Sequence, residues 1–269
     1  MTRVFHVPAM LIPLHQFSQG SLSGTGADYL EPVREVPGDL VFEFSGASSG
    51  HLHCDTTTNS AYAGVARSCA EGKKAHIQEI NEWLRQMLAT ECRLAFQIHQ
   101  VVERQAATRG SRASNRQRTF DLKVELFLKV GKNARVTFSQ VGTGVSQVLP
   151  VIATSLSGEV GCDLISQPEL HLHPRAQSIL GDLFLHSANK GRKKVIETHS
   201  EHLILRLLRR VSEASRGNSK KKLPGIRLVY IAPASEGSEC HLIRIDEHGQ
   251  FLDAWPSGFF EERFDDLFA

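Results

Sequence analysis

The stretch LISQPELHLHP, residues 164–174, decides the fold of the second half of the chain. Its apolar residues run up to Ser166, and Gln167, Pro168 and Glu169 follow before a His-x-His-Pro sequence. A short apolar run that ends in polar residues is typical of a buried parallel strand, whose carboxyl end presents side chains to a ligand. Two uncharged residues, Ser166 and Gln167, stand where a phosphate-handling site usually keeps its acids.

The segments that follow alternate between helix and strand patterns. PRAQSILGDLFLHSANKG has a proline in its first turn and a glycine past its end, as helices commonly do. KKVIETHS is a second strand, which ends in Glu197 and His199, and Ser200 then caps the amphipathic helix SEHLILRLLRRV. Because the carboxyl ends of parallel strands lie on one edge of a sheet, residues 166–169 and 197–200 are predicted to meet there.

Upstream of these strands, SQVGTGVSQVLPV places Gly142 and Gly144 directly before a helix. The free amides of a first helical turn, together with the positive end of the helix dipole, form an anion site. The order of helix, strand, helix, strand and helix from residue 146 predicts an α/β fold in which helices cover a parallel sheet.

Three ranges of the chain differ in composition. Residues 1–70 are rich in Gly, Ser, Thr and Pro, which predicts loops with short strands. Residues 71–139 contain one helical pattern, AHIQEINEWLRQML, and then antiparallel strands, of which FDLKVELFLKV and ARVTF form a hairpin around GKN. Residues 140–269 hold the alternating helices and strands, so this range carries the candidate site.

Composition narrows the class of protein. With 41% hydrophobic and 22% charged residues, the chain has the composition of an ordinary globular protein. A net charge of +2 gives no general attraction to polyanions, so any surface for nucleic acid must be local. Five scattered cysteines without a CxxC pair fit the reducing cytoplasm, and no apolar run reaches the length of a membrane span.

Four stretches follow one another along the second half of the chain: VGTGVSQVLPV, PELHLHPRAQ, ETHSEHLILRLLRR and WPSGFFEERFDDLF. In this order they resemble a bacterial family of ABC-type ATPases, often labelled AAA, that is similar to the overcoming-lysogenization-defect and SMC-like ATPases. The resemblance covers roughly residues 137–268. It implies a head domain that holds ATP and Mg²⁺ between two subunits of an oligomer, in a cytoplasmic complex for DNA processing, DNA repair or antiphage defence.

The resemblance also implies roles for individual residues. The signature motif, which caps the nucleotide held by a partner, is matched by Gly142, Gly144, Ser146 and Gln147. Ser166 falls at the position of an acid that binds Mg²⁺, and Gln167 matches the family but has no carboxylate to act as a general base. Glu169 is then the nearby carboxylate that remains. His199 falls at the switch histidine, which senses the γ-phosphate.

The chain departs from the family at the phosphate-binding loop. The pattern GxxxxGK[ST] does not occur, and VGKN at residues 130–133 is a hairpin turn. The family carries its P-loop near the N-terminus, so the sequence resembles the later half of such a head. Two hypotheses stay open: an ATPase subunit or fragment that completes a composite site with a P-loop-bearing subunit, or a catalytically inert scaffold of the same kind of complex.

Two other features have two interpretations each, and the aromatic tail has one. The basic segment 104–118 is either a solvated loop or a nucleic-acid surface, although no aromatic residues interleave with its charges. Histidines and a cysteine at metal-ligand spacing are more simply turn residues: His51, His53, Cys54, His171 and His173. The tail is expected to bury three aromatic side chains, Trp255, Phe259 and Phe260. A serine hydrolase is disfavoured, because GxSxG is absent.

Overall fold

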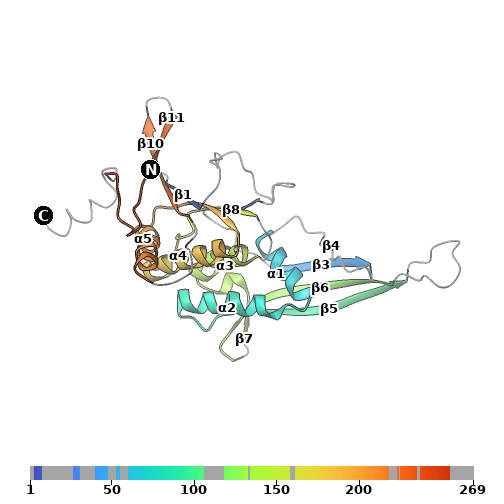
Figure 1. The fold of residues 1–269 in the computed structure, drawn as a ribbon. Helices are drawn as coiled ribbons and strands as arrows, with labels where there is room; N and C mark the ends of the chain where they lie inside the picture. Colours follow the sequence, from blue (N-terminus) through green and yellow to red (C-terminus); the bar gives the residue numbers. More distant parts are fainter. Residues whose placement is uncertain are drawn as a thin grey trace, which may run out of the picture. The chain divides into compact units, whose positions relative to one another are not determined.

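The computed structural model describes residues 3–7, 27–30, 40–47, 53–54, 60–105, 118–132, 134–157, 161–217, 223, 225–234 and 237–254. They belong to two compact units, one formed by Met1–Arg34 with Glu159–Ala269 and the other by Glu35–Gly158 (Figure 1). Most of the basic segment, His51 and the aromatic tail lie outside the described residues, so their predicted roles stay predictions.

The first unit contains a mixed sheet of six strands. From edge to edge these are β11 (Gly237–Ile243), β10 (Arg227–Ala234), β1 (Arg3–Val7), β9 (Lys193–Glu197), β8 (Cys162–Ser166) and β2 (Ala27–Leu30). The three strands β2, β8 and β9 are parallel, as predicted for β8 and β9. β1 lies antiparallel between β9 and β10, and β10 and β11 form an antiparallel hairpin. The α/β fold class is therefore confirmed.

Two helices of the first unit follow the strands that carry the candidate site. α4 (Pro174–Asn189) connects β8 to β9, and α5 (Glu201–Arg216) follows β9. The predicted cap of α5 is present, because the Ser200 hydroxyl accepts a hydrogen bond of 3.1 Å from the Leu203 amide. The apolar face of α5 buries Leu203, Ile204, Leu207 and Leu208.

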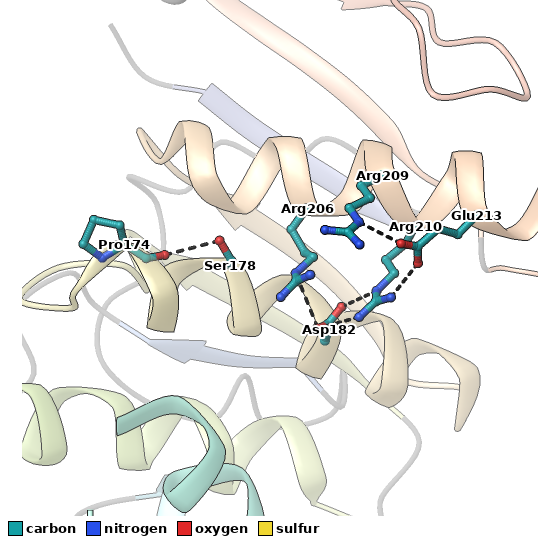
Figure 2. A network of polar contacts seen from close by, with 7 residues as sticks. All are labelled: Pro174, Ser178, Asp182, Arg206, Arg209, Arg210 and Glu213. Atoms are coloured by element: carbon teal, nitrogen blue, oxygen red, sulfur yellow. Dashed lines mark hydrogen bonds and ion pairs between the residues drawn. The ribbon is translucent and has the colours of Figure 1, made fainter. Parts of the chain in front are cut away.

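An ion-pair network joins α4 to α5 (Figure 2). Asp182 of α4 accepts two hydrogen bonds from Arg210, at 2.7 and 3.0 Å, and lies 3.5 Å from the Nε atom of Arg206. Glu213 accepts from Arg209 and Arg210 on the outer side of α5. Because the Asp182–Arg210 pair is bidentate, it fixes the register of the two helices more than it adds to stability.

A buried ionic cluster lies inside the first unit. The Asp163 carboxylate of β8 accepts a 2.6 Å hydrogen bond from Arg192 and a hydrogen bond from Lys194, and none of the three side chains is more than 4% exposed. Burial lowers the pKa of Lys194, although Asp163 opposes this shift. One carboxylate therefore offsets the buried charge of two cations.

The segment after β11 packs against α5 through a glycine. Gly249 has φ +74°, and a Cβ atom there would lie 2.2 Å from the Leu208 carbonyl oxygen. We expect Gly249→Ala to lower the free energy of unfolding by more than the roughly 1–3 kcal/mol of backbone strain alone. Gly237→Ala is the matched control, because Gly237 also has a positive φ, +95°, but open space around it. Equal melting temperatures for the two variants would contradict the close contact.

The second unit contains an antiparallel sheet. Its strands, in spatial order, are β4 (His53–Cys54), β3 (Leu40–Ala47), β6 (Arg118–Val130) and β5 (Arg93–Gln105), with β7 (Ala134–Val136) paired to β6. The predicted hairpin of β6 and β7 is confirmed. Only the start of β5 contributes to the core, since Leu94 is 1% exposed and Ile98 is 41% exposed.

Among the described residues, three α-helices belong to this second unit. They are α1 (Ser60–Ala70), α2 (Lys74–Leu88) and α3 (Thr143–Leu156). The pattern of the sequence predicted α2 and α3, whereas α1 formed in a range expected to hold loops and short strands. Tyr62 of α1 packs edge-on against Phe138, with 5.8 Å between the ring centroids. In the described part of the chain, no helix combines the length and apolar character needed to cross a membrane.

Candidate functional site

The predicted strand ends lie side by side in the first unit. β8 and β9 are parallel neighbours, and their register pairs Ser166 with Glu197. Past the end of β8, the Gln167 amide donates a 2.8 Å hydrogen bond to the Glu197 carbonyl oxygen. This edge is the place where ligands bind in open α/β sheets.

A carboxylate that had no predicted role, that of Glu197, lies beside Ser166. The buried Ser166 hydroxyl donates a 2.7 Å hydrogen bond to the Glu197 carboxylate. The sequence indicated Glu169 as the acid that remained near this position, and the structure corrects that view by adding Glu197 from the next strand. Ser166 and Glu197 are each the last residue of their strand, and this much was visible in the sequence. That they touch follows only from the register of the two strands.

Glu169 has one oxygen engaged and one without a hydrogen-bond partner. Its Oε1 atom accepts a 2.6 Å hydrogen bond from the His199 amide, which ties the turn after β8 to the end of β9. Its Oε2 atom is buried and has no hydrogen-bond partner among the described residues. A buried carboxylate oxygen without a partner is unfavourable, so this atom is suited to a ligand that donates a proton or carries positive charge.

The turn after β8 has a strained backbone. Gln167 has φ +43° and His171 has φ +62°, in the left-handed region that non-glycine residues rarely adopt. Each such residue costs on the order of 1–3 kcal/mol, and residues of this kind cluster at functional sites. The turn is closed by a 3.1 Å hydrogen bond from the Leu172 amide to the Glu169 carbonyl oxygen.

His199 lies between two residues that fix its backbone. The Thr198 hydroxyl accepts from the Ser200 amide at 3.0 Å, and the Ser200 hydroxyl donates to the Gln177 side chain at 2.7 Å. Thr198 and Ser200 are buried, whereas the His199 side chain is exposed. Its imidazole is therefore presented to solvent from a rigid backbone, which suits contact with a ligand from outside this unit.

His173 of the opening stretch has a structural role. The His173 ring nitrogen caps α4 by accepting a 3.3 Å hydrogen bond from the Arg175 amide. No set of three or more His, Cys, Asp or Glu side chains within the described ranges is arranged to hold a metal ion. A metal site built on His171 and His173 thus has no support within those ranges.

The residues matched to the signature motif lie in the second unit, at the start of α3. Gly142 is the N-cap and makes no side-chain cap, so the first amides of α3 are presented outward. Ser146 and Gln147 are buried, at 1% and 5% exposure, and the Ser146 hydroxyl bonds to the Thr143 carbonyl oxygen. Their predicted contact with a nucleotide stays a prediction, and at the start of the motif Gly142 and Thr143 are exposed whereas Gly144 is half-buried.

These groups fit parts of a nucleotide site. Free helical amides suit phosphate oxygens, and carboxylates at a strand edge suit Mg²⁺, which commonly takes one or two protein carboxylates together with phosphate oxygens. A loop of the form GxxxxGK[ST], which would hold the β-phosphate, is absent from the 269 residues. The chain thus has amides suited to capping a nucleotide and carboxylates suited to a cation. It does not have the loop that would hold the β-phosphate.

No curated protein matches the chain. One similar solved structure comes from work on ATP-driven dimerization and DNA stimulated activation of SMC ATPases. It has 10% sequence identity and a TM-score of 0.38, over 66% of this chain and 89% of that chain.

Two family models match separate parts of the sequence. Residues 226–269 match a family described as a protein of unknown function (DUF3696). Residues 57–204 match the AAA ATPase domain, and this match includes the start of α3 and the ends of β8 and β9. Since the match covers more than half of the sequence, the chain belongs to the AAA ATPase domain family.

Proposed function

We propose that the chain contributes the signature, Walker-B-like and switch-histidine elements of a composite ATP site, in an ABC-type head similar to those of the overcoming-lysogenization-defect and SMC-like ATPases. The phosphate cradle comes from a P-loop outside these 269 residues, carried by a partner subunit or a homologous head. The AAA ATPase family match supports an ATP-binding role, and the absence of GxxxxGK[ST] supports a divided site.

The observation that carries this proposal is the environment of Gly142. Its φ of −60° is open to any residue, and a Cβ atom there would meet nothing within 4 Å. The fold of the second unit therefore gives no reason for a glycine at this exposed position. A glycine at this position is explained if another molecule approaches the backbone closely. Phosphate bound at free helical amides requires such an approach.

The residues at the edge of the first unit have distinct tasks in this proposal. The exposed His199 imidazole contacts the γ-phosphate, and the side-chain amide of Gln167 orients water without removing its proton. Glu169, held by the His199 amide, is the carboxylate that accepts a proton. When bound, Mg²⁺ neutralises phosphate charge.

ATP-dependent capture tests the proposed function. The tagged full-length chain is incubated with extract of its source cells, with Mg-ATP, with Mg-ADP or without nucleotide. We expect a protein that contains GxxxxGK[ST] to be retained with ATP and lost without it, and the purified pair to bind ATP. Retention of the same partner without any dependence on nucleotide would contradict a shared ATP site.

That contrary result would favour the second candidate, an inert scaffold. The observation on its side is that Ser166 and Gln167 supply no charge where catalysis needs a metal and an oriented water. In either case we propose a DNA-processing or antiphage complex in the cytoplasm. The segment 104–118, with five arginines and no acid, is the proposed contact with nucleic acid.

A further inference from the structure

Glu197 is held in a fixed orientation by a group that is itself inaccessible. Ser166 is 2% exposed, and its hydroxyl donates to the Glu197 Oε2 atom at 2.7 Å. A hydrogen bond to a carboxylate is short and directional, so it selects one rotamer of Glu197. The serine hydroxyl is thereby engaged with the carboxylate rather than with a ligand.

A second carboxylate is anchored at the same strand end. Glu169 accepts from the amide of His199, two residues after Glu197, and its buried Oε2 atom has no hydrogen-bond partner. Glu169 is 7% exposed. Within the described part of the chain, neither Glu169 nor Glu197 forms an ion pair with a lysine, arginine or histidine. Arg192, which directly precedes β9, and Lys194 of β9 are instead engaged by Asp163.

Two anchored carboxylates without a basic partner, one with a buried oxygen lacking a donor, favour a bound cation. We infer that Glu197 is the carboxylate that meets a divalent cation at this edge, that Glu169 adds negative charge there as the proton acceptor proposed above, and that Ser166 is a positioning residue for Glu197. The inference rests on the proposed function only for the nature of the remaining ligands, which are phosphate oxygens and water.

This division of roles accounts for the uncharged residue at position 166. A carboxylate from β9 stands where β8 supplies a hydroxyl, so the edge keeps its negative charge. Mg²⁺ retains several waters and needs few protein ligands, which agrees with the lack of a complete three-residue cage among the described residues.

Manganese alone is the probe, because it takes the same oxygen ligands and is detected directly by electron paramagnetic resonance. The full chain without nucleotide is titrated with Mn²⁺. We expect weak, saturable binding that Glu197→Gln removes and that Ser166→Ala weakens by about tenfold, as for residues that orient a ligand. Ser166→Thr, which keeps the hydroxyl, is expected to retain binding. Glu247→Gln is the matched control, since the Glu247 side chain is 80% exposed.

Melting in the presence of EDTA or Mn²⁺ gives a second readout. Mn²⁺ is expected to raise the melting temperature of the wild-type chain and of Glu247→Gln, and not that of Glu197→Gln. Without metal, Glu197→Gln is expected to melt no lower than wild type, because it removes one of two carboxylates at the edge.

The outcomes separate this inference from the proposed function. Absence of saturable Mn²⁺ binding by the wild-type chain, or unchanged binding by Glu197→Gln, would overturn the cation site. Loss of ATP-dependent capture with Mn²⁺ binding intact would overturn the composite ATP site and leave the cation site standing.

Discussion

Replacing Asp163 with asparagine is expected to lower the free energy of unfolding by about 3–5 kcal/mol, the range found when one partner of a buried ion pair is removed. The substitution keeps the volume of the side chain and removes the charge that Arg192 and Lys194 share. Both buried cations then lose the carboxylate that they contact. Urea unfolding followed by circular dichroism measures the change.

The loss of unfolding free energy that Asp163→Asn causes is expected to become smaller as the pH rises. Asp163 opposes the lowering of the Lys194 pKa, so its removal lowers that pKa further. At a pH between the lowered pKa of Lys194 in the folded variant and the ordinary lysine pKa, Lys194 holds a proton in the unfolded state and has released it in the folded state. Stability of the variant therefore increases with pH in that window.

Asp253→Asn is the control for the buried cluster. Asp253 also pairs with an arginine, Arg244, but Asp253 is only half-buried and Arg244 is exposed, so little change is expected. Equal stability of Asp163→Asn and Asp253→Asn would show that the buried cluster does not stabilise the first unit.

Gly142→Asp is expected to weaken ATP-dependent association with the P-loop partner by at least about a hundredfold, since like charges brought together across an interface cost several kcal/mol. The new carboxylate would face the phosphates that the first amides of α3 are proposed to cap. The open space around Gly142 means that the fold of the second unit is unaffected. Association is measured by titrating the labelled partner with the chain in Mg-ATP.

Gly142→Ala separates charge from bulk at the same position. It is expected to melt like the wild type and to weaken association less than Gly142→Asp. Wild-type association of Gly142→Asp would remove the start of α3 from the nucleotide interface.

Much of the fold was predictable because local signals determine it. Helical periodicity, a first-turn proline and a serine cap defined α4 and α5, and short apolar runs defined β8 and β9. These elements also delivered Gln167, Glu169 and His199 to one edge, since parallel neighbours end on the same side.

What could not be predicted depends on pairing between distant segments. Nothing in the residues of β1 indicates that it inserts between β9 and β10. The contact between Ser166 and Glu197 needed the register of two strands, and the burial of Ser146 and Gln147 needed the packing around α3. The helix α1 was missed because its small residues give a weak apolar stripe.

Isothermal titration of the purified chain with Mg-ATP tests the composite site most directly. Without a P-loop the chain has neither the backbone cradle nor the lysine that holds the β-phosphate. The account predicts a dissociation constant no tighter than about millimolar, on the order of 4 kcal/mol, for the chain alone, and tight binding once a P-loop-bearing partner is added. Micromolar affinity of the chain without any partner would contradict it.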